Sequence, residues 1–213
     1  MRSSILSSLL VLLLLGGCVP LRPPLLKPCA WDTARGPGLA SPFDGKFEKM
    51  LFRATIDIRK VHLTGMMMVK VMPDSSTRIV FSNEIGMTFF DFVMKKDSFE
   101  PGYIFEPMNR KALIGMFRTC FELMLTYRID AAGNKAYCDL ASGDNVIYGR
   151  FGRYKTWAGT PAGREAATYI NGMTNFSDQA YIRFSDFHGE VPFATEIDNP
   201  FVDLRIRLNM ISM

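Results

Sequence analysis

The chain has 213 residues, 48% of them hydrophobic, and its 25 Lys and Arg against 21 Asp and Glu give a net charge of +4. This length is enough for one domain with a full hydrophobic core. The positive excess is too small to indicate nucleic-acid binding. Methionine and phenylalanine are abundant, with 14 and 17 residues, which indicates soft and adaptable apolar surface.

The first 17 residues have the pattern of an export signal. Arg2 precedes an apolar run from Leu9 to Leu15, much shorter than the ~20 residues of a membrane-spanning helix. The run ends in Leu15-Gly16-Gly17-Cys18, which resembles the lipobox of bacterial lipoproteins. The resemblance implies that residues 1–17 are removed and that Cys18 carries acyl chains such as palmitate, which give stable membrane attachment. Ordinary secretion with an incidental cysteine is the alternative.

The residues after Cys18 indicate which membrane receives the protein. Residue 19 is Val, where the inner-membrane retention signal of many such lipoproteins has Asp, and no acidic run of the surface-export type follows. We therefore expect a lipid anchor in the cell outer membrane, with the protein facing the periplasm.

Three further cysteines are Cys29, Cys120 and Cys138. Disulfides are permitted in an exported chain, and the odd number leaves one cysteine unpaired. A bridge between Cys120 and Cys138 and a pair of small buried thiols are both compatible with the sequence.

Residues 18–44 predict a lipidated, proline-rich tether. The prolines of this stretch disfavour a regular helix or a central strand and favour extended chain; they are Pro20, Pro23, Pro24, Pro28, Pro37 and Pro42. We expect a single folded domain over residues 45–213.

Alternating apolar and polar residues begin at Met50. Phe52, Ala54, Ile56 and Ile58 are separated by polar side chains, which predicts a strand with one buried face. Further strands are expected at 61–72, 77–83, 87–94 and 99–105. The short connections between them predict an antiparallel meander.

One amphipathic helix is predicted after Asn109, which is expected to cap it. Its apolar residues recur at three- and four-residue spacing: Leu113, Ile114, Phe117, Cys120, Phe121, Met124 and Leu125. After residue 130 we expect strands near 135–140, 146–154, 166–171, 179–187, 194–198 and 202–208. The sum is an α+β fold: a strongly curved antiparallel sheet of about 10–11 strands, an incomplete β-barrel, with the helix covering its concave face.

Catalytic and metal-binding patterns are missing from the sequence. Its two histidines, His62 and His188, stand in no HExxH motif, and neither a GxSxG nucleophile elbow nor a GxxxxGK[ST] phosphate loop is present. We therefore expect no catalytic residue, no metal site, no cofactor and no enzymatic activity.

Two clusters each leave two interpretations open. Arg150, Arg153 and Lys155 alternate with aromatic residues, so they form either a solvated strand face or a contact with anionic lipid headgroups. The run Met66-Met67-Met68 with Phe89-Phe90 either lines a flexible lipid cavity or belongs to the core.

The order of these segments resembles the LolB family, outer-membrane lipoproteins that receive other lipoproteins from a periplasmic carrier. The strands from Ala54 to Asn83 are similar to that family's opening strands. The segment Ser82–Phe92 resembles the family's strand, proline-leucine-glycine loop and next strand, and Val191-Pro192 to Leu208 resembles its last two strands.

The resemblance implies an apolar half-barrel of the LolA/LolB type that accommodates acyl chains. The candidate cavity residues are Phe52, Ile56, Leu63, Met67, Phe90, Phe92, Phe117 and Phe121. The loop at Ile85 and Gly86 matches the family's membrane-inserting loop, with Ile85 in place of the leucine. The alternative is that Ile85 folds back into the core.

Two departures from the family pattern affect the expected function. Glu84 stands where the family has proline, and the segment after Tyr127 is predicted as strand where the family continues with helix. The sequence therefore predicts an outer-membrane-anchored lipoprotein that binds acyl chains of lipoproteins or lipids and helps to transfer them to the membrane. The expected partners are the membrane, these acyl chains and a periplasmic carrier protein, with no nucleic acid. The alternative is a non-catalytic accessory subunit of an envelope complex.

Overall fold

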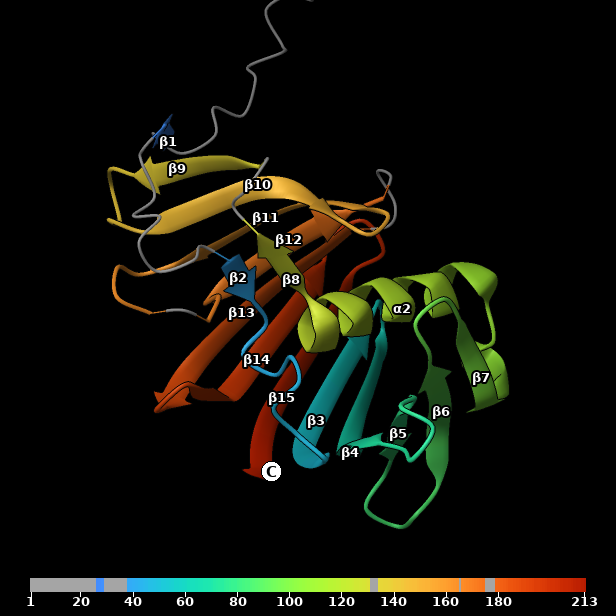
Figure 1. Ribbon diagram of the computed structural model, residues 1–213. Coiled ribbons are helices and arrows are strands. Elements are labelled where there is room, and N and C mark those ends of the chain that lie inside the picture. Colours follow the sequence, from blue (N-terminus) through green and yellow to red (C-terminus); the bar gives the residue numbers. More distant parts are fainter. Residues whose placement is uncertain (1–25, 29–37, 131–133, 165, 175–178) are drawn as a thin grey trace, which may run out of the picture.

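The computed structural model describes residues 26–28, 38–130, 134–164, 166–174 and 179–213. The predicted signal peptide and Cys18 lie outside these residues. Figure 1 shows an α+β fold in which one long helix accompanies an extensive sheet.

The strands of the first half are β1 (Leu26–Pro28), β2 (Gly38–Ala40), β3 (Lys49–Ile58), β4 (Val61–Val71), β5 (Thr77–Ser82), β6 (Thr88–Met94) and β7 (Phe99–Ile104). A 3-10 helix, η3 (Glu106–Met108), and the long helix α2 (Lys111–Thr126) follow. The second half contains β8 (Arg128–Asp130), β9 (Lys135–Asp139), β10 (Asn145–Phe151), β11 (Tyr154–Thr160), β12 (Tyr169–Met173), β13 (Gln179–His188), β14 (Val191–Asn199) and β15 (Leu204–Ser212).

Thirteen of these strands form one sheet in the order β1-β9-β10-β11-β12-β13-β14-β15-β3-β4-β5-β6-β7. The pairings between neighbouring strands of this sheet are all antiparallel. The two halves of the chain meet in the middle, where β15 pairs with β3 and Ile206 lies opposite Ile56. Because β1 and β7 are edges, the sheet is not closed.

Each central strand buries every second side chain, as the alternation predicts. On β15, Leu204, Ile206 and Leu208 are buried, whereas Arg205 and Arg207 lie on the other face. Arg205 pairs with Asp198 at 2.7 Å and Arg207 with Asp57 at 3.1 Å. Exposed ion pairs of this kind contribute little to the free energy of folding. Burial of the apolar face therefore contributes most of the stability of this strand.

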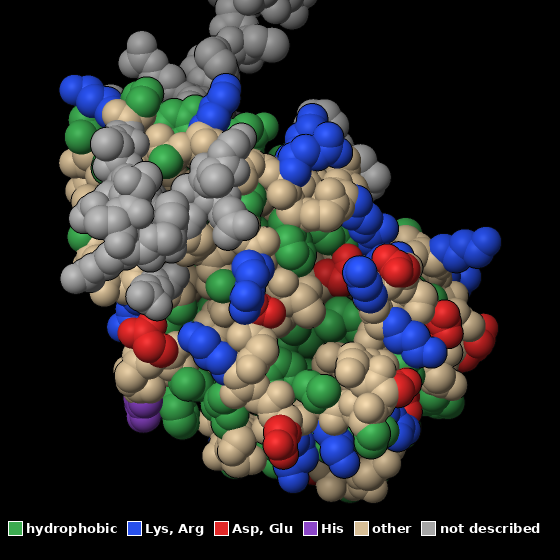
Figure 2. All heavy atoms as spheres, in the orientation of Figure 1, with side chains coloured by type: hydrophobic (Ala, Val, Ile, Leu, Met, Phe, Trp, Pro, Cys, Tyr) green, Lys and Arg blue, Asp and Glu red, His purple; other side chains and the backbone are tan. Residues whose placement is uncertain are grey.

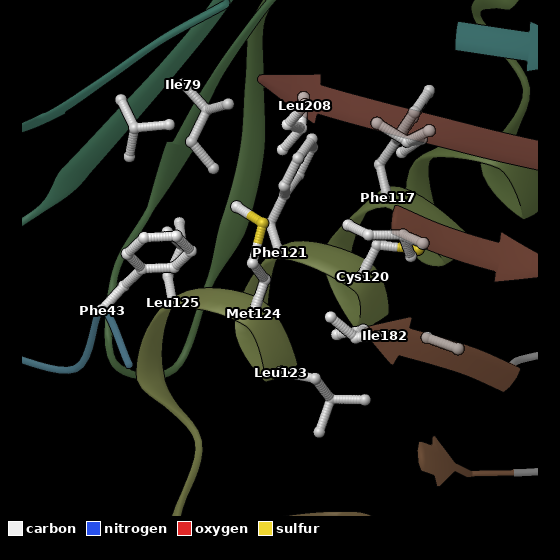
Figure 3. Close-up of a cluster of buried hydrophobic side chains, with 14 of the residues drawn as sticks. Phe43, Ile79, Phe117, Cys120, Phe121, Leu123, Met124, Leu125, Ile182 and Leu208 are labelled. Carbon is white, nitrogen blue, oxygen red and sulfur yellow. The ribbon is translucent and has the colours of Figure 1, made fainter. Parts of the chain in front are cut away.

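Helix α2 packs its apolar stripe against one face of the sheet (Figures 1 and 3). The ring of Phe117 lies 5.0 Å from that of Phe90 on β6. A Cβ atom at Gly172 on β12 would lie only 2.5 Å from Leu123 Cδ1, so the helix approaches β12 closely. Both ends of the sheet therefore contribute to the core beneath α2.

Residues 38–44, at the end of the expected tether, pack onto the folded domain. Within residues 38–44, β2 pairs with β8, and Leu39 and Phe43 are fully buried. Ser41 donates its backbone N–H to Tyr127 O at 2.7 Å. The prolines exclude only central strands and helices, and burial of two large apolar side chains is sufficient to hold this extended segment on the domain.

Several local predictions are corrected by the structure. The sheet has more than 10–11 strands, partly because the strand expected at 146–154 is two strands with a turn at Gly152, whose φ is +54°. Strands β1, β2 and β8 have three residues each, too few for a periodic pattern. Asn109 does not cap α2; the N-cap is Arg110, without a side-chain cap hydrogen bond.

Cys120 and Cys138 do not form a bridge with each other. Cys120 is a buried residue outside any disulfide, whereas Cys138 is disulfide-bonded. Cys120 lies within the apolar stripe of α2 and Cys138 on β9 near an edge of the sheet, which separates the two sulfur atoms.

Candidate functional site

The predicted cavity residues come together in the hydrophobic core. Leu63 is partly buried, and the other seven are almost fully buried: Phe52, Ile56, Met67, Phe90, Phe92, Phe117 and Phe121. Phe90 stacks on Phe92 at 4.7 Å, and Phe117 stacks on Phe121 at 5.9 Å. Figure 3 shows Phe117 and Phe121 of α2 among buried apolar side chains of the helix and the sheet, such as Leu208 and Ile182.

The β5–β6 turn presents Ile85 to solvent. Ile85 is 90% exposed, so it does not fold back into the core. Asn83 holds the turn: its side-chain oxygen accepts the Met87 N–H at 2.8 Å, and its carbonyl oxygen accepts the Gly86 N–H at 3.1 Å. Gly86 has a φ of +87°, which glycine adopts without a Cβ penalty. The turn therefore keeps an isoleucine in solvent. Burial of this side chain would contribute roughly 1.5 to 3 kcal/mol to the free energy of folding.

Neighbouring turns at the same end of the sheet also expose apolar side chains. Strands β14, β15, β3, β4, β5 and β6 are consecutive and antiparallel, so the β14–β15, β3–β4 and β5–β6 turns follow strand ends of the same direction. The β4–β5 pairing ends with Met66 opposite Ser82, so the β5–β6 turn is set apart from the other two. Phe201 in the first turn is 64% exposed, Val61 beside the second is 53% exposed, and Met87 beside the third is 44% exposed. Arg59 N donates to Asp203 O at 2.9 Å and joins the first two turns.

We call Val61, Ile85, Met87 and Phe201 the apolar rim. Large apolar residues that are exposed at turns are typical of a surface that contacts a membrane or another protein. Sequence reasoning identified Ile85 but missed Val61 and Phe201. Both stand at turns, where a large apolar residue is a local signal, but their proximity depends on the pairing of β15 with β3.

A second cluster of functional groups lies on the solvent side of α2, around Glu122. Its carboxylate accepts a hydrogen bond from the buried Tyr154 hydroxyl and pairs with Arg118 at 2.6 Å. Arg153 lies 3.9 Å from the same carboxylate and donates to the Tyr154 hydroxyl at 2.9 Å. Burial, together with the negative charge of Glu122, raises the pKa of Tyr154 well above its usual value. Tyr154 therefore remains a neutral donor that fixes Glu122.

Among the described residues, no group of three His, Cys, Asp or Glu side chains could hold a metal ion. In the same part of the chain, no helix is long and apolar enough to cross a membrane.

No family model and no curated protein sequence matches the chain. The solved structures that resemble it include the following two. A DUF1329 family protein from Desulfovibrio piger ATCC 29098 is 9% identical with a TM-score of 0.40, covering 78% of this chain and 85% of that one. An outer membrane lipoprotein-sorting protein domain from Vibrio parahaemolyticus is 8% identical with a TM-score of 0.37, covering 79% and 86%. The likeness is one of coarse fold, and we transfer no function from it.

Proposed function

We propose that the protein is a non-enzymatic lipoprotein, anchored through Cys18 on the periplasmic side of the outer membrane. It binds acyl chains of lipoproteins or lipids between α2 and the sheet and passes them to the membrane at the apolar rim. The observation that carries this proposal is Ile85, which a hydrogen-bonded turn holds 90% exposed next to the exposed Met87. A periplasmic carrier protein is the proposed donor of the cargo.

The contacts of α2 with strands that are distant in the sheet order support a half-barrel around the helix. Phe117 contacts β6 and Leu123 approaches β12, and these two strands are seven places apart in the sheet order. In a flat sheet they would be about 34 Å apart, whereas Phe117 and Leu123 are about 9 Å apart along the helix axis. We infer that the sheet bends around the helix, with α2 on its concave face.

The helix is held unequally at its two ends. At the C-terminal end, the Ser41 hydroxyl donates to Met124 O, and Arg128 pairs with Asp44 at 2.6 Å. At the other end the first five residues of α2 are not buried, and Arg110 provides no side-chain cap. An acyl chain therefore enters most easily by displacing the N-terminal half of α2, which carries Phe117.

The filled interior favours a second candidate function, an accessory subunit of an envelope complex with no lipid cargo. The two candidate functions differ in one respect. Only the lipid-binding function requires α2 to move aside for an acyl chain. Apolar interiors packed to the usual density admit a ligand only if side chains or a helix move.

Uptake of an acylated peptide distinguishes the two functions. Full-length protein in mild detergent is mixed with a diacylated peptide and, as a matched control, with the same peptide without chains. We expect a one-to-one complex with the acylated peptide in native mass spectrometry and faster amide hydrogen exchange in the N-terminal half of α2. A protein that takes up neither peptide, with unchanged exchange, would be assigned to the accessory function.

A further inference from the structure

A polar cleft of about 560 Å³ lies beside α2, away from the apolar rim. It is bordered by the solvent side of α2, by the β6–β7 turn and by the β10–β11 turn. Its volume is within the range of small-ligand sites. Figure 2 shows Lys and Arg side chains interspersed with Asp and Glu side chains on the face of the molecule that α2 crosses.

The lining of the cleft carries a net positive charge. Its positive side chains are Lys95, Lys96, Arg118 and Arg153, and its negative ones are Asp97 and Glu122. Both arginines lie within ion-pair distance of the carboxylate of Glu122. Lys95 and Lys96 form no ion pair within the described part of the chain. The lining thus has two more positive than negative side chains, which favours an anionic ligand.

The floor of the same cleft is apolar and continuous with the core. Met94 and Tyr154 line the cleft and also belong to the buried set of residues. Met94 packs within the hydrophobic core against which α2 lies. A flexible methionine at this point can move aside at low cost. Its movement would open a path from the charged cleft into the hydrophobic core beneath α2. Such a site fits a molecule with one anionic end and one apolar end.

We propose that this cleft binds the phosphate of a glycerophospholipid whose acyl chains enter beneath α2. The assignment rests on the proposed function, since it names the class of lipid that the same interior receives. Arginine forks and lysine point charges are the usual protein ligands of phosphate. The β4–β5 and β6–β7 turns beside the cleft are at the opposite end of β5 and β6 from Ile85. The headgroup therefore remains in water while the rim contacts the bilayer.

The test compares two lipids with identical chains, dipalmitoyl phosphatidylglycerol and dipalmitoylglycerol, bound to the full-length protein in neutral detergent. We expect about tenfold tighter binding of the phosphate-bearing lipid, as for one or two charge-assisted hydrogen bonds. The double variant Lys95→Gln with Lys96→Gln loses most of this preference and keeps the affinity for dipalmitoylglycerol. The control, Arg150→Gln with Lys155→Gln, removes the same charge from the neighbouring hairpin outside the cleft and keeps the preference.

Three results would overturn the inference. The first is equal binding of both lipids by the natural sequence, which leaves the proposed function standing. The second is an equal loss of preference in the two double variants, since this indicates overall charge and not the cleft. The third is binding of inorganic phosphate or glycerol 3-phosphate as tight as that of the lipid, which assigns the cleft to a soluble ligand. Binding of neither lipid contradicts the proposed function itself.

Discussion

At the scale of single residues, Ile85 has a conformation that the turn imposes. Asn83 and Gly86 fix the backbone, so the side chain remains exposed whatever its chemistry. Substitutions at this position therefore change the surface and leave the fold intact, which makes Ile85 suitable for a test of function.

We expect Ile85→Glu to abolish transfer of an acylated peptide from the protein to liposomes while binding of the peptide persists. A carboxylate cannot enter the hydrocarbon region without a large desolvation cost. The control is Leu140→Glu, which places the same charge at another exposed apolar residue (55% exposed) outside the rim and leaves transfer unchanged. Transfer by Ile85→Glu at the rate of the natural sequence would exclude Ile85 from delivery.

At the scale of elements, the segment 38–44 supports the C-terminal end of helix α2. Phe43 lies in the same buried cluster as Met124 and Leu125 of α2 (Figure 3), and its ring meets Phe184 at 5.8 Å and Phe52 at 6.1 Å. The segment thus joins the C-terminal end of α2 to strands on both sides of the β15–β3 junction.

Phe43→Ala is expected to lower the free energy of unfolding by roughly 3 to 5 kcal/mol, the usual cost of removing a buried phenylalanine. Urea unfolding followed by circular dichroism measures the change. The control, Phe201→Ala in an exposed turn, should alter the free energy of unfolding by less than about 0.5 kcal/mol. Similar values for the two variants would show that residues 38–44 do not contribute to the folded domain.

At the scale of the whole molecule, three tyrosines make the stability sensitive to alkaline pH. Burial raises the pKa of Tyr169 to about 12, with a contribution from the negative charges of Asp144 and Asp139, and burial also raises the pKa values of Tyr127 and Tyr154. A raised phenol pKa means that the folded state holds its proton more tightly than the unfolded chain, whose tyrosines titrate near pH 10.

The stability that these tyrosines contribute is complete below pH 10 and is lost as the pH rises from about 10 towards 12. We therefore expect the urea midpoint to remain constant between pH 8 and pH 9.5 and to fall at pH 11. The variant Tyr169→Phe, which has no phenol proton at this position, should show a shallower fall. An unchanged slope in this variant would contradict the role of Tyr169.

Local alternation in the sequence was sufficient to predict strands β3 to β7, the second-half strands β9 and β13 to β15, helix α2 and the loop around Ile85. Apolar residues that recur every two or every 3.6 residues can be recognised from neighbouring positions alone. This spacing places them on one face of a strand or helix, and that face is then buried. The presence of large apolar side chains in the core, such as Phe90 and Phe117, follows from the same pattern.

Only the tertiary structure decided which of these elements meet. The pairing of β15 with β3 brings Phe201 beside Val61 in the apolar rim, and the packing of α2 brings Arg118 beside Arg153 in the cleft. The attachment of Phe43 to the core and the filling of the interior also depend on contacts between distant segments. Packing and the strand order of the whole sheet determine these contacts. The periodic pattern of one strand or helix does not indicate which other element it will contact.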